Sequence, residues 1–219
     1  MKKRLFLACI TFLLINISLA QTAFPPFAND ILRFKKQDSI VPPVKNAILF
    51  VGSSSFAKWK DVADYFPGYI IVNRGFGGST MLDVIRYAYD IIVPYQPKQV
   101  FIYAGDNDLA EGASVAEVVT RFKTLFQLIR INVPNATMDY ISIKPSPSRE
   151  NLMPKMKEAN KQIEAFLKTQ KNTGFINVFS PMLNADGKPK PEIFVEDRLH
   201  MNADGYAIWK KTILPYLKK

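Results

Sequence analysis

Residues 47–56 read AILFVGSSSF, and this stretch decides the fold. Residues 47–51 form a continuous apolar run, which is typical of a strand buried on both faces of a sheet. Gly52 ends the run, and the serines after it lead into a short helix that we predict over residues 55–66. A buried strand followed directly by a helix is the repeating unit of a parallel sheet covered by helices.

The same alternation of apolar runs and amphipathic segments continues to the C-terminus. We predict further strands over residues 69–72, 99–104, 138–143 and 175–179. We predict further helices over residues 80–93, 115–131, 153–169 and 203–217, with Asn202 capping the last of them. The predicted fold class is therefore α/β, a three-layer α/β/α sandwich around a five-stranded parallel sheet.

The first 20 residues, MKKRLFLACITFLLINISLA, have the pattern of a secretory signal peptide. A basic head at residues 2–4 precedes an apolar stretch that ends on Ser18, Leu19 and Ala20, a typical cleavage site. We expect cleavage near Ala20, export to the periplasm or the medium, and no stable membrane insertion afterwards. A retained membrane anchor is the alternative, although a spanning helix needs about 20 apolar residues.

Residues 21–45 contain two Pro-Pro pairs and little periodicity. We predict an extended N-terminal arm here, lying over a single catalytic domain that covers residues 46–219. About 200 residues, with 48% hydrophobic residues in the whole chain, are enough for one well-buried core. The 16 phenylalanines and the long apolar runs exclude a disordered chain.

Cysteine, histidine and charge counts exclude further classes. The one cysteine, Cys9, lies in the predicted signal peptide, so the mature chain has neither a disulfide framework nor a thiolate metal site. The one histidine, His200, rules out a multi-histidine metal site. Without its first 20 residues the chain has 26 basic and 19 acidic residues, a net charge of +7. Because these charges are spread along an exported chain, we expect no nucleic-acid binding.

Polar residues and glycines gather where the predicted strands end. They occupy residues 52–55, 73–79 and 105–108, and a fourth group at residues 197–200 precedes the last helix. Ligands of parallel α/β sheets bind outside the carboxyl ends of the strands. We therefore expect these segments to form one site.

His200 is the one candidate for a base that works near neutral pH, where histidine ordinarily changes its charge. Asp197 stands three residues earlier, a spacing that brings two side chains to one side of a turn. The carboxylate could hold one imidazole nitrogen and leave the other free as a general base. A surface turn with an incidental salt bridge is the alternative.

The other three groups each have a functional and a structural interpretation. The serine turn could present a nucleophile at a helix N-terminus, or a serine could simply cap the helix. The glycine loop at residues 75–78 offers backbone N–H donors, but a dinucleotide fingerprint would need glycine in place of Thr80. Asn107 could donate its amide to a developing oxyanion, or it could only form a turn.

Together the four groups resemble the four blocks of the SGNH (GDSL-like) hydrolase family of serine esterases. Residues 48–54 are similar to the first block and residues 73–80 to the second. Residues 105–108 match the third block, and Asp197-Arg198-Leu199-His200 matches the last. The resemblance covers approximately residues 47–217, and it implies a flavodoxin-like arrangement of the sheet.

The resemblance implies a serine esterase that uses neither a cofactor nor a metal ion. It assigns a catalytic triad of Ser54, His200 and Asp197. It assigns the oxyanion hole to the backbone N–H groups of Ser54 and Gly78 and to the side-chain amide of Asn107.

Two positions depart from the family pattern. Ser53 stands where the family motif has an aspartate, so the choice of nucleophile among Ser53, Ser54 and Ser55 depends on the alignment. Ser79 replaces an aspartate that is frequent in the second block, which concerns the support of the loop more than the donor at Gly78.

The family includes carbohydrate deacetylases, short-chain esterases and lysophospholipid or platelet-activating-factor-type acylhydrolases. The chain has no obvious lid insertion, which favours a small acyl group, most simply acetyl on a sugar. Lys144 and Arg149 follow the fourth predicted strand, and we predict that they contact this small-molecule or glycan ester; a rigid proline loop with solvated charges is the alternative. A catalytically silent carbohydrate- or acyl-binding protein and a phosphate-binding α/β protein are the competing classes.

Overall fold

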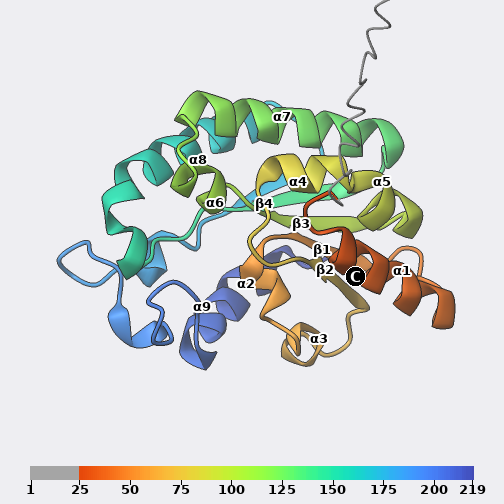
Figure 1. The fold of residues 1–219 in the computed structure, drawn as a ribbon, viewed down its shortest axis with the longest axis horizontal. Coiled ribbons are helices and arrows are strands. Elements are labelled where there is room, and N and C mark those ends of the chain that lie inside the picture. Colours follow the sequence, from red (N-terminus) through yellow and green to blue (C-terminus); the bar gives the residue numbers. More distant parts are fainter. Residues whose placement is uncertain (1–24) are drawn as a thin grey trace, which may run out of the picture.

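The computed structural model describes residues 25–219, so the predicted signal peptide lies outside the described residues. Five parallel strands form one sheet in the order β2-β1-β3-β4-β5. Helices cover both faces of this sheet (Figure 1), which confirms the predicted three-layer sandwich. The strands are β1 (Ile48–Gly52), β2 (Ile71–Gly75), β3 (Gln99–Tyr103), β4 (Thr137–Ile141) and β5 (Thr173–Ile176).

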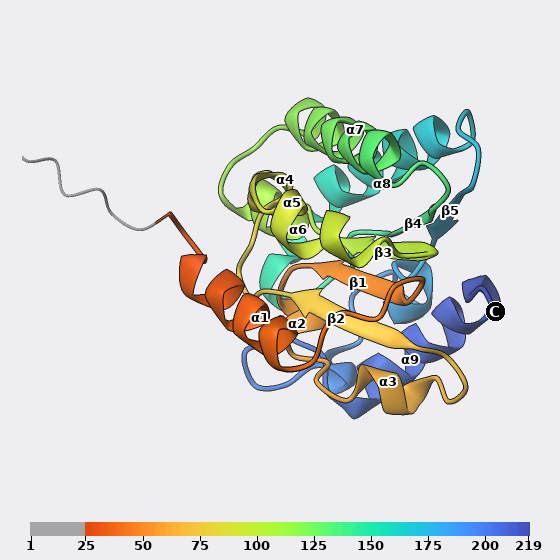
Figure 2. The same ribbon diagram turned by 90° about the vertical axis from the view of Figure 1, so that its right-hand side faces the viewer.

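The two helical layers are clearest along the sheet edge (Figure 2). One layer contains α4 (Met81–Arg86), α5 (Ala88–Ile91), α7 (Val115–Asn132) and α8 (Met153–Leu167). The other contains α2 (Ser54–Ala57), α3 (Val62–Tyr65) and α9 (Ala203–Ile213). Helix α1 (Ala28–Ile40) lies at the β2 edge, and α6 (Asp106–Ala110) directly follows β3. Within residues 25–219, no helix combines the length and the apolar character that crossing a bilayer requires.

The central strand β1 shows why the sheet is buried on both faces. All five of its residues are buried, and successive side chains of a strand point to opposite faces. Leu49 and Val51 join the apolar core that also includes residues of α4, α5, α7 and α8. Ile48 and Phe50 join a second core with Trp59 and Trp209. A continuous apolar run is therefore what this position in the sheet requires.

The strand order places the switch point of the sheet between β1 and β3. The chain moves from β1 outward to β2 and then returns to β3 on the other side of β1. Ligand sites of such sheets lie at the carboxyl ends of the two strands beside the switch point. Gly52 ends β1 there with φ 138°, and a Cβ atom on it would lie 1.8 Å from the Tyr103 carbonyl oxygen. Only glycine fits this close approach.

The predicted extended arm is wrong for residues 28–40, which form α1. Ile31 and Phe34, three residues apart, are buried on one face of this helix. Asp38 near its end forms an ion pair of 2.5 Å with Arg74 of β2. The helix is therefore stabilised by packing and pairing with distant parts of the chain, which local periodicity does not reveal.

The ends of the predicted strands differ from those in the structure by up to three residues, and three predicted helices are divided. The predicted helix over residues 55–66 is interrupted because Trp59, fully buried, turns into the core between α2 and α3. The predicted helix over residues 80–93 is divided into α4, α5 and a 3-10 turn at residues 93–95. The last helix ends at Ile213 and continues as a 3-10 turn over residues 214–216, because proline at position 215 has no N–H to donate.

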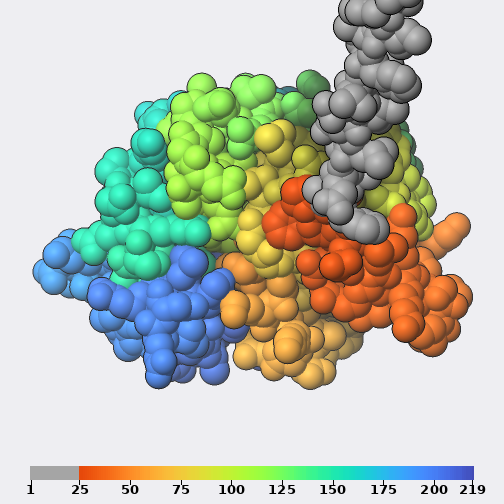
Figure 3. Space-filling model, in the orientation of Figure 1, coloured from red at the N-terminus to blue at the C-terminus, as the bar shows by residue number. Residues whose placement is uncertain are grey.

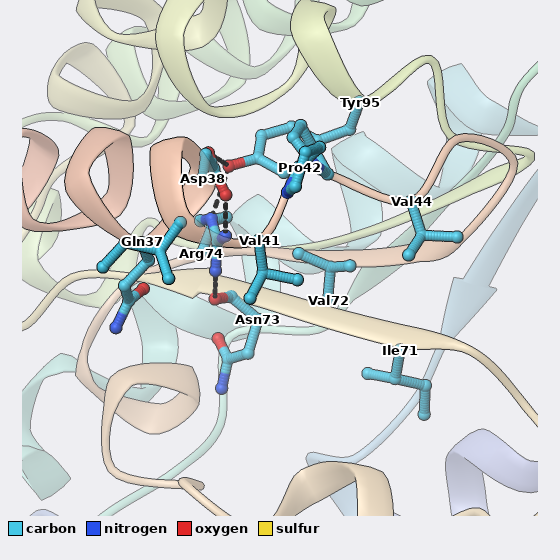
Figure 4. A pocket seen from close by; sticks show the side chains of 12 residues that line it. Gln37, Asp38, Val41, Pro42, Val44, Ile71, Val72, Asn73, Arg74 and Tyr95 are labelled. Carbon is cyan, nitrogen blue, oxygen red and sulfur yellow. Dashed lines mark hydrogen bonds and ion pairs between the residues drawn. The ribbon is translucent and has the colours of Figure 1, made fainter.

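A hollow of about 390 Å³ lies between the end of α1 and the edge strand β2 (Figure 4). Arg74 donates hydrogen bonds there to Asp38 and to the Tyr95 hydroxyl. Burial and the hydrogen bond with Asp38 raise the pKa of Tyr95 to about 12. None of the predicted catalytic residues lines this hollow.

Asp139 of β4 provides a pH-dependent contribution to stability. Burial raises its pKa to about 6, although Gln99 donates a hydrogen bond to it. The folded state then binds more protons than the unfolded state between about pH 4 and 6, so this group lowers stability as pH rises through that range. We expect Asp139→Asn to increase the free energy of unfolding at pH 7 by about 1–2 kcal/mol and to change it little at pH 4.

Urea unfolding at both pH values measures this effect, with Asp186→Asn in an exposed turn as the control. An equal change for Asp139→Asn at the two pH values would contradict the raised pKa.

Candidate active site

The serine turn after β1 exposes one of its three serines. Ser53 caps α2 and is fully buried, and Ser55 is 2% exposed. Ser54, the first residue of α2, is partly exposed. The Tyr206 hydroxyl of α9 donates a hydrogen bond of 2.9 Å to the Ser55 carbonyl and holds the turn from the far end of the chain. The Ser54 hydroxyl is therefore the accessible one at this strand end.

His200 joins Ser54 and Asp197 in one line of hydrogen bonds. His200 Nε2 lies 2.9 Å from Ser54 Oγ, across 146 residues of sequence. His200 Nδ1 lies 2.5 Å from Asp197 Oδ2. A carboxylate at Nδ1 selects the tautomer with the proton on that nitrogen, which leaves Nε2 to accept the Ser54 proton. The geometry thus favours Ser54 among the three serines.

The loop that carries Asp197 and His200 is held by its own backbone. Burial opposes the ionisation of Asp197, but three hydrogen bonds outweigh it and lower the pKa of this carboxyl well below its usual range. The donors are the His200 ring and the backbone N–H groups of His200 and Leu199, which lie 2.8 and 2.9 Å from Asp197 Oδ1. An antiparallel bridge between Phe194 and Met201 closes the loop. The carboxylate is therefore charged and oriented before any ligand binds.

Two of the predicted oxyanion donors meet at Ser53. Asn107 Nδ2 lies 3.0 Å from Ser53 Oγ and 3.0 Å from the Ser79 carbonyl oxygen. The backbone N–H of Ser54 also donates to Ser53 Oγ, at 2.6 Å. Ser53, which replaces the family's aspartate, thus accepts hydrogen bonds from both donors and keeps them next to Ser54. The sequence did not predict this role.

The third predicted donor, Gly78, comes from the loop after β2. Its φ of 84° lies in the left-handed region, which favours glycine. Among residues 25–219, no hydrogen-bond acceptor is found for its N–H. The N–H groups of Gly75 and Phe76, in contrast, donate to Asn73 Oδ1 and to the Gly52 carbonyl. Two of the four N–H groups of this loop are therefore already used inside the protein.

The predicted turn around Asn107 is the short helix α6. Gly105 precedes it with φ 116°, and Asp106, Asn107 and Asp108 are all buried. Asp108 accepts a hydrogen bond of 2.9 Å from the Met81 N–H and pairs with Arg121 at 2.8 Å. Asp108 thus connects the Asn107 segment to the start of α4, a role that has no local signal in the sequence.

Arg149 reaches the site from the segment after β4. Its Nη2 donates a hydrogen bond of 2.9 Å to Asn107 Oδ1, and its Nη1 lies 3.1 Å from Asp106 Oδ2. Its side chain is 17% exposed, so the guanidinium borders the site without being fully enclosed. The contact with Asn107 also orients the amide, because it occupies the oxygen and directs the NH₂ group toward Ser53.

The predicted substrate contact is wrong for Lys144, which is 1% exposed. Its Nζ donates a hydrogen bond of 2.8 Å to the Leu199 carbonyl and lies 5.7 Å from the centre of the Phe194 ring. Burial lowers the pKa of Lys144 to about 8. Lys144 therefore supports the loop that carries His200 from inside the protein.

We expect Lys144→Met to lower kcat for ester hydrolysis about 10-fold with little change in KM. Methionine fills a similar volume but leaves the partly buried Leu199 carbonyl without its donor, which costs about 1–3 kcal/mol and lets His200 move. Steady-state kinetics with p-nitrophenyl acetate measure the effect, and Lys155→Met on the exposed side of α8 is the control. Equal kcat values for the two variants would show that Lys144 does not support the loop that carries His200.

The structure therefore joins Ser54, His200 and Asp197 directly and places Gly78 in the loop after β2 and Asn107 in the short helix α6. Within the described part of the chain, no three histidine, cysteine, aspartate or glutamate side chains are grouped to hold a metal ion. The sheet and the segments around it define the SGNH hydrolase type of α/β fold. The chain belongs to the GDSL-like lipase/acylhydrolase family, whose model matches residues 38–208.

Solved structures with similar folds include three informative examples. A structure from Streptococcus pneumonia, described by the name platelet activating factor, has a TM-score of 0.77 and 21% identity over 87% of this chain and 92% of its own. A GDSL-like lipase from Bacteroides thetaiotaomicron has a TM-score of 0.73 and 24% identity, over 85% and 96%. A variant of the acetyl-xylooligosaccharide esterase Axe2 from Geobacillus Stearmophilus has a TM-score of 0.66 and 16% identity, over 79% and 94%. The search of curated proteins gave no match.

Proposed function

We propose that this protein is an exported serine esterase that removes short acyl groups, acetyl above all, from a carbohydrate. The observation that carries the proposal is the 2.9 Å contact between His200 Nε2 and Ser54 Oγ, with Asp197 on the opposite ring nitrogen. A hydroxyl hydrogen-bonded to a base that is itself oriented by a carboxylate is the arrangement of an activated serine nucleophile.

Acylation begins when Ser54 Oγ attacks the ester carbonyl carbon and His200 Nε2 takes the hydroxyl proton. The carbonyl oxygen becomes an oxyanion, for which the Ser54 and Gly78 N–H groups and the Asn107 amide are the donors. Preorganised donors of this kind are worth roughly 10²–10³ each in rate. His200 then gives its proton to the alcohol oxygen, the carbon–oxygen bond breaks, and the acyl group remains on Ser54.

Deacylation repeats these steps with water as the nucleophile. His200 takes a proton from water, the resulting hydroxide attacks the acyl carbon, and the carboxylic acid leaves as the proton returns to Ser54 Oγ. Asp197 stabilises the imidazolium in both halves of the reaction. The low pKa of its carboxyl keeps this negative charge in place over the working pH range.

Three features support a small acyl group on a sugar. The chain is similar in structure, over 79% of its length, to a protein named as an acetyl-xylooligosaccharide esterase. The guanidinium of Arg149 borders the site, where it can donate hydrogen bonds to sugar hydroxyls. The predicted signal peptide would place the enzyme where extracellular polysaccharides are found.

Acetate release from acetylated xylo-oligosaccharides tests the substrate class, with lysophosphatidylcholine and p-nitrophenyl acetate in parallel assays. We expect hydrolysis of the sugar ester and of p-nitrophenyl acetate, with little release of long-chain fatty acid. Preferred hydrolysis of lysophosphatidylcholine would favour a lysophospholipase instead. A protein that turns over none of the three esters would be a binding protein of the same fold.

A further inference from the structure

Phe27, at the start of α1, lies beside the oxyanion loop. Its Cε1 and Cζ atoms are 3.8 and 4.0 Å from the position that a Cβ atom would take on Gly78. Its ring packs edge-on against Phe76, with 5.3 Å between the ring centres. The family match begins only at residue 38, so this ring comes from a segment outside the matched residues.

Contacts with the body of the protein fix the position of the Phe27 ring. Phe27 has φ 65°, a left-handed conformation that a bulky residue adopts only where its surroundings impose it. The Tyr87 hydroxyl donates a hydrogen bond of 2.7 Å to the preceding carbonyl, that of Pro26. Further along α1, Lys35 pairs with Asp90 at 2.6 Å. The helix therefore fixes the ring against the body of the protein.

Two glycines separate this ring from the nucleophile. Ser54 Cβ is 3.9 Å from the position that a Cβ atom would take on Gly77. Phe27 Cε1 is 3.8 Å from the position that a Cβ atom would take on Gly78. Consecutive glycines leave no side chains of their own on this side of Ser54. The nearest bulky side chain next to Gly78 is that of Phe27.

The chemistry of the adduct limits the directions that the acyl chain can take. The alcohol oxygen has to lie near His200, which protonates it, and the oxyanion has to face its donors. The acyl chain takes the remaining direction, away from His200. In Figure 3 the blue C-terminal region, to which His200 belongs, and the red N-terminal segment lie on opposite sides of the orange and yellow segments that carry Ser54 and the glycine loop.

We propose that Phe27 is a specificity-determining residue that ends the acyl pocket and restricts the enzyme to short acyl groups. This inference rests on the proposed esterase function and deepens it. A single methylene group in an apolar pocket is worth roughly 10- to 200-fold in specificity. The apolar face of the Phe27 ring, backed by Phe76, would accept an acetyl methyl group and exclude a longer chain.

The test compares kcat/KM for p-nitrophenyl acetate and p-nitrophenyl hexanoate in the full-length protein and its variants. We expect Phe27→Gly to raise the hexanoate-to-acetate ratio at least about 10-fold, since glycine removes the ring and adopts the left-handed conformation without strain. Phe27→Leu keeps an apolar contact for α1 and should raise the ratio less. Leu32→Ala, at an exposed position of the same helix, is the control and should leave the ratio unchanged.

An unchanged ratio in both Phe27 variants, with acetate turnover retained, would overturn the role of Phe27 and leave the esterase function intact. A similar rise in Leu32→Ala would also overturn it, because general loosening of α1 would then explain the effect. A wild-type protein that hydrolyses neither ester would overturn the proposed function, and this inference would fail with it.

Discussion

Ser54→Ala is expected to lower kcat/KM for p-nitrophenyl acetate by about 10⁴-fold or more. The variant keeps the backbone N–H of residue 54 and the oxyanion donors, but it removes the oxygen that His200 deprotonates. The rate that remains should be that of water attack assisted by the donors alone. Steady-state hydrolysis at pH 7.5 measures the loss.

Ser55→Ala is the matched control, because Ser55 stands in the same turn and is also small and polar but is buried. We expect its activity to stay within about threefold of the wild type. A large loss in Ser55→Ala with full activity in Ser54→Ala would show that the nucleophile is assigned to the wrong serine.

Asn107→Ala is expected to lower kcat by roughly 10²–10³ while KM changes little, because the oxyanion exists only after the nucleophile has attacked. Asn107 Nδ2 lies beside the serine turn, 3.0 Å from Ser53 Oγ, and the N–H that donates to Ser53 has to turn to the oxyanion when it forms. The kinetics of p-nitrophenyl acetate hydrolysis separate kcat from KM.

Asn107→Asp tests whether the side chain has to donate hydrogen bonds. The carboxylate preserves the size of the side chain and the contact with Arg149, but it accepts hydrogen bonds and repels a negative charge. We expect this variant to be at least as slow as Asn107→Ala and to unfold at a lower temperature than the wild type, because the carboxylate cannot donate to the Ser79 carbonyl. Activity within threefold of the wild type in either variant would exclude Asn107 from the oxyanion hole.

The sequence predicts the layers of the fold because β1, β3 and β4 are almost wholly buried runs and amphipathic segments alternate with the strands. The five strands and the long helices α7 and α8 are evident from periodicity alone. Helix α1 is not, because its stability depends on Ile31 and Phe34 packing against elements distant in the sequence. The ends of α2 and α9 also depend on tertiary packing and on a proline.

The sequence could predict which residues belong to the candidate site, but not how they are arranged in space. Motif spacing identified Ser54, Asn107 and His200, whereas the contact across 146 residues needs the folded sheet. Lys144 shows the limit of this reasoning: a lysine after a strand reads as a surface residue, yet it is buried under Leu199. Phe27 carries no motif at all, and only the position of α1 brings it to Gly78.

The most direct test of the central claim is covalent labelling with a fluorophosphonate, followed by mass spectrometry of the peptide that contains residues 53–55. An activated serine oxygen attacks phosphorus, fluoride leaves, and the phosphonyl group remains on that oxygen. Activation of Ser54 by His200 predicts one label per chain, located on Ser54, and its loss in His200→Ala. A label on another residue, equal labelling of His200→Ala, or an unlabelled protein that still hydrolyses esters would contradict it.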